Sequence, residues 1–461
     1  MRGNMKETDK KQNMLTGSPG KSLFFFALPM IFGNLFQQFY NMADSVIVGR
    51  YVGENALAAV GASYSLTTVF IMVAIGGGIG ASVITSQYLG AKEYGKMKTS
   101  IYTALITFLV LSILLAAGGY FGNRQILQAL KTPGNILEDA VTYLRIYFCG
   151  LPFLFMYNVL SAMFNSLGKS RIPLYLLLFS SVLNVVLDLY MVRVLHLEVA
   201  GVAIATVIAQ GVSVIISFGI LLRYLKRFSM DEEELKEGGR FKLYDADMLV
   251  RGTKIAIPSI IQQSIVSIGM LLVQSVVNGF GSSVLAGYSA GTRIESICIV
   301  PMIATGNAVS TFTAQNLGAK QSERVKKGYR AGGCMVAVFA VIICVVLRLF
   351  HSSIIQIFME GDGGIEALET GNAYLTFIAP FFVLIGVKAI TDGVLRGAGD
   401  VNIYMIANLV NLGIRVLVAN IFAPIVGVQA VWWAVPIGWG VNFLISFIRY
   451  KTEKWSKKQV I

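Results

Sequence analysis

Polar side chains recur along one side of an apolar stretch near the N-terminus. At 100° per residue they occupy about a third of a helix circumference, and the other side carries Leu, Phe, Met and Ala. These polar residues are Asn34, Gln37, Gln38, Asn41, Asp44 and Ser45. An ionisable side chain at membrane depth costs at least a few kcal/mol, so Asp44 is a candidate functional residue. The alternative is a carboxylate that only makes a structural hydrogen bond.

A second acid has a similar setting further along the chain. Asn184 and Asp188 are four residues apart and therefore share a helix face. The next apolar segment has its own polar stripe, which includes Thr206. Carboxylate, amide and hydroxyl oxygens are hard ligands that suit Na⁺, and a pair of acids serves equally well to carry a proton. A purely structural role, in which Asp188 ties two helices together, is the alternative.

Composition indicates what kind of protein holds these residues. The chain has 461 residues, of which 55% are hydrophobic and 14% charged, and its mean hydropathy is +0.67. A soluble domain has about 25% charged residues, so the sequence predicts an integral membrane protein. Its four cysteines lie in apolar segments without the spacing of metal ligands, and we expect no cofactor beyond a coupling ion.

Charge placement predicts the topology. Of the 38 Lys and Arg residues, 29 fall on one side of the predicted spans and 5 on the other, which is the positive-inside pattern for two cytoplasmic termini. The net charge of +13 is thus explained without a nucleic-acid partner. The twelve apolar segments are 22–46, 55–88, 99–121, 138–163, 172–195, 200–225, 249–279, 284–315, 328–350, 367–393, 402–424 and 428–449.

The two halves of the sequence resemble each other. The segment 87–92, Gln-Tyr-Leu-Gly-Ala-Lys, recurs at 315–320 as Gln-Asn-Leu-Gly-Ala-Lys, and its glycine predicts a helix stop. Six spans followed by six similar spans indicate a duplication with parallel repeats, and so an all-α membrane fold of two pseudo-symmetric six-helix bundles. The predicted division is an N-terminal tail (1–21), an N-lobe (22–225), a cytoplasmic linker (226–248), a C-lobe (249–449) and a C-terminal tail (450–461).

The duplicated half lacks both acids. At an offset of 229, Asn34 corresponds to Gln263, but Asp44 corresponds to Val273. At an offset of 227, Asn184 corresponds to Asn411, and Asp188 corresponds to Arg415. We therefore expect ion coupling in the first half alone.

The second half offers other acids. Asp392 lies four residues after Lys388, a spacing that predicts a neutralising pair within one helix. Glu295 is a candidate for a second ion or substrate carboxylate. No phosphate loop, nucleophile elbow or His-Glu-x-x-His motif occurs, and no long exterior loop is predicted, so an enzyme is not expected.

The motifs together resemble those of the multidrug and toxic compound extrusion (MATE) transporters of the MOP superfamily, over about residues 20–450. The similarity rests on Asn41-Met-Ala-Asp44 in a proline-containing first span, the repeated Gln-x-Leu-Gly-Ala-Lys, Leu395-Arg-Gly-Ala-Gly-Asp400 and the duplication. The DinF-like or a related prokaryotic branch fits best. The NorM-like branch has a glutamate in its seventh helix, where this chain has Gln262 and Gln263.

The resemblance implies a secondary active efflux transporter that alternates access and exchanges small cationic or amphipathic organic compounds for H⁺ or Na⁺. It assigns ion coupling, with Na⁺ as one candidate ion, to Asp44, Asn184, Asp188 and Thr206. Further ion or substrate contacts are expected among Asn34, Gln38, Asn41, Tyr143, Asn158, Gln263, Glu295, Asp392 and Asn411.

Two other functions compete with efflux. One is a lipid-linked oligosaccharide flippase of the same superfamily, and the other is a membrane enzyme or assembly factor without transport. We expect a monomer in the bilayer of the cell membrane.

Overall fold

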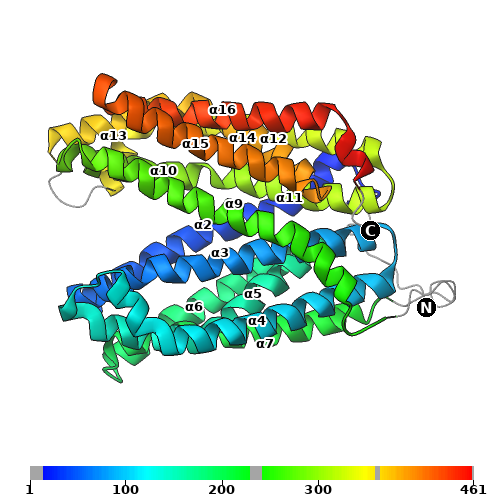
Figure 1. Cartoon of the computed structure of the whole chain (residues 1–461), viewed down its shortest axis with the longest axis horizontal. Helices are drawn as coiled ribbons and strands as arrows, with labels where there is room; N and C mark the ends of the chain where they lie inside the picture. The colour runs from blue at the N-terminus through cyan, green and yellow to red at the C-terminus, as the bar shows by residue number, and fades with distance from the viewer. Residues whose placement is uncertain (1–13, 229–240, 359–363, 459–461) are drawn as a thin grey trace. The chain divides into compact units, whose positions relative to one another are not determined.

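The chain folds into long helices joined by short turns (Figure 1). The computed structural model describes residues 14–228, 241–358 and 364–458, and these residues form no strand. Twelve spans among them are long and apolar enough to cross a membrane, which confirms the predicted fold class. Ten are single helices, α2 (Pro19–Tyr51), α3 (Glu54–Gly90), α4 (Tyr94–Ala129), α5 (Gly134–Ser166), α6 (Arg171–Arg193), α7 (Glu198–Leu225), α9 (Ala246–Asn278), α12 (Ser322–Phe358), α15 (Val401–Val426) and α16 (Gln429–Lys451).

Proline interrupts the other two spans. The span Ser282–Gly318 divides into α10 (Ser282–Cys298) and α11 (Val300–Gly318), with Pro301 in the first turn of α11. The span Ile365–Gly397 divides into α13 (Ile365–Ile378), the 3₁₀ turn η1 (Ala379–Phe381), which contains Pro380, and α14 (Phe382–Gly397). Proline lacks the N–H that a continuous helix needs, so the interruptions fall where the backbone bond is lost.

The repeated Gln-x-Leu-Gly-Ala-Lys segments end their helices in the same way. Lys92 and Lys320 adopt left-handed φ angles of 63° and 57°. In each copy the following N–H closes a six-residue turn, Glu93 to the Tyr88 carbonyl at 3.0 Å and Gln321 to the Asn316 carbonyl at 2.7 Å. Each helix ends at the glycine of the motif, as predicted, α3 at Gly90 and α11 at Gly318, and the lysine two residues later takes the left-handed position.

A second pair of turns does use glycine in that position. Gly168 has φ 75° after α5, and Gly399 has φ 78° after α14. The next N–H groups, of Lys169 and Asp400, both bond back at 2.8 Å, to the carbonyls of Phe164 and Leu395. Equal backbone geometry at matching places supports the duplication that the sequence predicts.

The structure contains two compact units, which we call the Phe32–Ile260 unit and the Ile261–Ile461 unit; the second also contains Met1–Ile31. The unit boundaries fall inside α2 and α9, shortly after Pro29 and Pro258. The predicted ranges of the lobes, linker and tails stay a prediction. Parts of the predicted linker and of both tails lie outside the described residues, at 1–13, 229–240 and 459–461.

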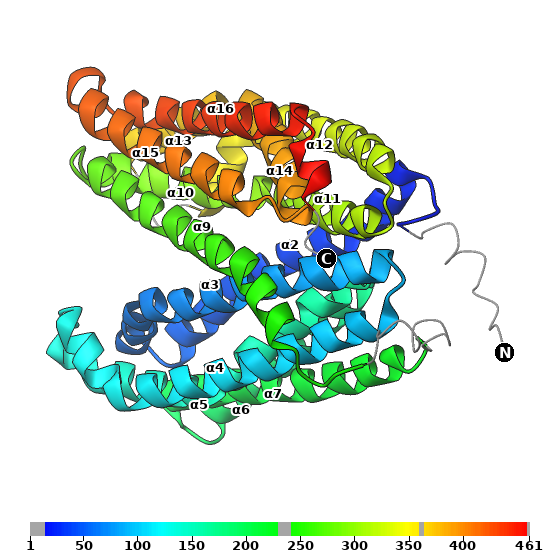
Figure 2. The ribbon, with the colours of Figure 1, turned by 45° about the vertical axis from the view of Figure 1, so that its right-hand side comes forward.

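Helix neighbours repeat between the two units. In the Phe32–Ile260 unit, α5 packs against α3, α4 and α7, and α6 packs against α7 (Figures 1 and 2). In the Ile261–Ile461 unit, α14 packs against α11, α12 and α16, and α15 packs against α16 (Figure 2). The two bundles therefore have the same pattern of neighbouring helices.

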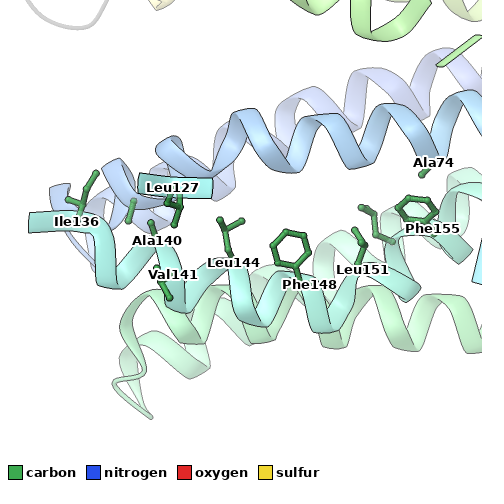
Figure 3. Close-up of a cluster of buried hydrophobic side chains, with 11 residues drawn as sticks. Ala74, Leu127, Ile136, Ala140, Val141, Leu144, Phe148, Leu151 and Phe155 are labelled. Carbon is green, nitrogen blue, oxygen red and sulfur yellow. The ribbon is translucent and has the colours of Figure 1, made fainter. Parts of the chain in front are cut away.

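Apolar packing on α5 holds the Phe32–Ile260 unit together. Figure 3 shows Leu144, Phe148, Leu151 and Phe155 along α5, in a cluster with Leu127 of α4. The aromatic rings of Phe70 and Phe148 meet edge to face within this cluster, with centroids 5.3 Å apart. This core fixes α5, and through it α7, next to the polar residues described below.

Candidate functional site

Four helices of the Phe32–Ile260 unit bring the predicted acids together. The helix α2 places Tyr40 and Asp44 one turn apart, and α6 does the same for Asn184 and Asp188. The carboxyl groups of Asp44 and Asp188 are in direct electrostatic contact and within hydrogen-bonding reach of each other. The site therefore joins the two acids that lie 144 positions apart in the sequence.

Each acid has one oxygen without a partner. Asp188 is fully buried, and neither its Oδ1 nor the Oδ1 of Asp44 makes a hydrogen bond with any described residue. Two carboxylates in contact repel each other in an apolar environment, and a proton or a monovalent cation between them relieves that repulsion. The pair can hold one small cationic charge.

The Asn184 amide contacts three neighbours of the acid pair. In the orientation that satisfies both ends of the amide, its nitrogen donates to Asp188 Oδ2 at 2.9 Å. Its oxygen then accepts from the Thr206 hydroxyl of α7 at 3.2 Å, and the Tyr40 hydroxyl also contacts the amide. Asn184 is 2% exposed, so these contacts fix the position of Asp188 without competition from water.

Tyr143 of α5 completes this group. It lies within electrostatic range of both carboxyl groups, and its ring stacks against Tyr147 with centroids 6.4 Å apart. Both tyrosines line a cavity of about 10 Å³, which is roughly the room that one water molecule needs. Its other lining residues are Gly150, Leu154, Ala203, Thr206, Val207 and Gln210.

The structure places the remaining candidates of this unit elsewhere. Asn41 accepts a hydrogen bond from Gln37 Nε2 at 2.9 Å on its own helix, and Asn158 donates to the Leu154 carbonyl at 2.8 Å. Asn34 is exposed and Gln38 is half-buried, and neither contacts the acid pair through a hydrogen bond between described residues. These side chains do not join the site.

Candidates in the Ile261–Ile461 unit form separate contacts. Asp392 pairs with Lys388 at 3.1 Å, as the spacing predicts, and it also accepts from the Ser446 hydroxyl at 2.6 Å. Glu295 accepts from the Tyr374 hydroxyl at 2.5 Å. The backbone carbonyl of Gln263 accepts a hydrogen bond from the Ser267 hydroxyl at 3.4 Å. Asn411, 9% exposed, has an amide oxygen without a partner among the described residues.

Sequence reasoning missed Tyr40 as a member of the polar site. Its hydroxyl bonds the Asn184 amide, which places it beside the acid pair. The signal was present, because Tyr40 lies four residues before Asp44 and therefore on the same helix face.

Comparison with known proteins identifies the family of the chain. A model of the MatE family matches residues 29–190 and again 258–421, once in each half. The probable multidrug resistance protein YpnP of Bacillus subtilis is 30% identical, over 97% of this chain and 98% of its own length. The multidrug export protein MepA of Staphylococcus haemolyticus is 26% identical over 93% of both chains.

Solved structures agree in fold. The crystal structure of MATE in complex with MaL6 superimposes with a TM-score of 0.87 at 22% identity, over 97% of this chain and 99% of that one. At this identity the likeness concerns the fold alone. The matched family model and the relatives show more, since they extend over most of the sequence. The chain is therefore a multi-pass membrane transporter, not an enzyme, and it belongs to the MATE family of multidrug efflux proteins.

Proposed function

We propose that this transporter exports small cationic or amphipathic organic compounds in exchange for protons, and that Asp44 and Asp188 form the coupling site. The contact between the two acids carries the proposal, because each has a buried oxygen that no described residue bonds. Protons that neutralise both acids remove the charge that attracts a cation. The relatives named for multidrug resistance and multidrug export support the substrate class.

The surroundings of the pair favour a proton over Na⁺. A sodium site built from all four predicted ligands needs oxygen atoms from Asn184 and Thr206 as well as from the acids. Here the Asn184 nitrogen faces Asp188, and its oxygen faces Thr206. The Thr206 hydroxyl also lies 3.0 Å from the Val202 carbonyl of its own helix. Two of the four ligands are thus engaged within the protein.

Coupling at this site follows from competition between protons and a cationic group for the negative charge of the acid pair. When the pair is ionised, the Asn184 amide stabilises Asp188 by donating to Oδ2, and the free oxygens attract a cation. When protons neutralise both acids, that attraction is lost and a cationic substrate is released. Occupancy by a proton and by a cationic group is then mutually exclusive, as exchange requires.

Ethidium efflux from proteoliposomes tests the proposal. We expect Asp44→Asn and Asp188→Asn to abolish efflux driven by a pH gradient, because an amide cannot bind the exchanged proton. Asp247→Asn is the matched control, since this exposed acid lies at the start of α9 and outside the site. Undiminished efflux in both site variants would refute the acid pair, and efflux driven by a Na⁺ gradient but not by a pH gradient would refute the proton.

A further inference from the structure

We propose that the Ile261–Ile461 unit contains a separate binding site for a carboxylate group of the transported compound, centred on Arg415 of α15. The inference rests on the proposed function, since it adds a second recognition point for the same substrates. Arg415 occupies the position of the duplicated half that corresponds to Asp188, so the charge there is positive instead of negative. Compounds with both a cationic and a carboxylate group are the predicted preferred substrates.

The backbone of α16 makes room for Arg415. Gly438 faces Asn411 and Arg415, which lie one turn apart on α15. A Cβ atom at position 438 would lie 2.2 Å from Asn411 Oδ1 and 3.0 Å from Arg415 Cγ, which is too close for any other residue without movement. The glycine thus lets a long cationic side chain pack directly against α16.

The guanidinium group of Arg415 has no partner within the described part of the chain. It makes no ion pair or hydrogen bond there, and its Nε is buried. Glu295, an acid in electrostatic range, accepts a hydrogen bond from the Tyr374 hydroxyl at 2.5 Å and forms no ion pair with Arg415 in the described part of the chain. A charge inside a membrane-spanning segment is costly unless paired, so this group is built to accept a counter-ion.

A second N–H donor without an acceptor among the described residues lies on the side chain next to Tyr374. Trp432 of α16 is 7% exposed, and its indole Nε1 has no acceptor among the described residues. Its ring lies edge-on to that of Tyr374, with centroids 6.0 Å apart, and Tyr374 is also in electrostatic range of Arg415. The planar guanidinium of Arg415 presents paired N–H groups that match the two oxygens of a carboxylate, and the Trp432 indole is a further N–H donor beside Tyr374.

Binding of two dyes that differ in one group tests the site. Rhodamine B carries a free carboxylate beside its cationic ring system, and rhodamine B ethyl ester has the same ring system with the carboxylate masked. Fluorescence anisotropy with purified, detergent-solubilised protein measures both affinities without an ion gradient. We expect the wild-type protein to bind the acid more tightly than the ester. Arg415→Gln should lower the affinity for rhodamine B about tenfold or more and leave the affinity for the ester unchanged.

Two further variants distinguish a specific effect at Arg415 from a general effect of charge or of misfolding. Arg293→Gln is the matched control, because Arg293 lies on α10 with an exposed side chain, and it should preserve both affinities. If Arg415→Gln does not fold, Arg415→Lys replaces it: a lysine keeps the charge but lacks the planar fork, so only the acid should weaken. Equal wild-type affinities for the two dyes, or an unchanged acid affinity in the Arg415 variant that folds, would overturn the proposal.

The dye experiment is independent of the coupling site. Asp188→Asn should lose gradient-driven efflux while keeping the preference for the acid over the ester. Loss of that preference in Asp188→Asn, with retention in Arg415→Gln, would overturn the carboxylate site. Failure of coupled efflux alone would concern only the proposed function.

Discussion

At the scale of single residues, Asn184 decides what the two acids can do. Its amide nitrogen donates to Asp188, its amide oxygen accepts from the Thr206 hydroxyl, and the Tyr40 hydroxyl contacts the same amide. The side chain is nearly fully buried. A hydrogen bond to a charged group contributes about 1.5–3 kcal/mol, which corresponds to roughly a tenfold change or more in an equilibrium. The position of the carboxylate thus depends on an uncharged neighbour.

Replacing that neighbour should weaken coupling without removing an acid. We expect Asn184→Ala to reduce proton-driven ethidium efflux about tenfold, because Asp188 loses its donor. Asn158→Ala is the matched control, since its amide bonds the Leu154 carbonyl of its own helix and makes no hydrogen bond to the acid pair within the described ranges. Equal efflux rates in Asn184→Ala and the wild-type protein would contradict the role given to Asn184.

At the scale of helices, glycine sets how closely α11 and α14 pack in the Ile261–Ile461 unit. A Cβ atom at Gly393 would lie 2.3 Å from the Gly306 carbonyl oxygen, and one at Gly397 would lie 2.2 Å from that of Ser310. Both neighbours are backbone atoms, so a side chain can be accommodated only by separating the helices. Small residues allow this close approach where lipid provides no hydrophobic drive for helix association.

A single methyl group therefore tests the helix contact. We expect Gly393→Ala to lower the free energy of unfolding by about 1–3 kcal/mol, the usual cost of overpacking, and to lower the thermal midpoint in detergent. Gly413→Ala is the control, because a Cβ atom there meets nothing within 4 Å, and it should be neutral or slightly stabilising. Equal midpoints for the two variants would contradict the packing account.

The turn between α14 and α15 is held by charges. Asp400 accepts from Arg449 at 2.5 Å and from Lys458 at 2.7 Å, which joins the turn to the end of α16 and to the segment after the 3₁₀ helix η2 (Lys454–Lys457). Burial alone favours the protonated acid, but the hydrogen bonds from Arg449 and Lys458 outweigh it, so the pKa of Asp400 is lowered.

This shift predicts the pH dependence of stability. A lowered pKa in the folded state means that the ionised Asp400 contributes fully above its ordinary pKa of about 3.9 and less as the pH falls through the lowered value. The thermal midpoint of Asp400→Asn should thus lie below that of the wild-type protein at pH 7, and the difference should shrink below about pH 4. A difference that stays constant between pH 7 and pH 3 would contradict the ion pairs.

At the scale of the whole molecule, the sequence predicts most of the architecture. Apolar length fixes the twelve spans, since every predicted segment overlaps a helical span of the structure. The repeated turns follow from the duplicated motifs. Local chemistry could not settle two details: that Pro301 and Pro380 would interrupt their spans while Pro29 and Pro258 would not, and that Lys92 would take the left-handed position. Both depend on packing around the backbone.

The sequence predicts the two acids of the candidate site but does not show which other side chains join them. Helical spacing links Asn184 to Asp188, and the cost of intramembrane charge singles out Asp44. The contact between α2 and α6 depends on how α5, α6 and α7 pack, which no spacing in one helix reveals. Asn34, Asn41 and Asn158 have the same side-chain chemistry as Asn184, and only the three-dimensional structure separates them.

The most direct test of the account separates coupling from movement of the substrate. Proteoliposomes that contain the wild-type protein, Asp44→Asn or Asp188→Asn are assayed for ethidium accumulation under an imposed pH gradient and for ethidium–ethidium exchange without a gradient. We predict that both variants lose gradient-driven accumulation and retain exchange, because the one remaining acid still attracts the cationic dye, whereas the acid pair that binds the exchanged proton is lost. Gradient-driven accumulation at the wild-type level in both variants would contradict a coupling site at Asp44 and Asp188.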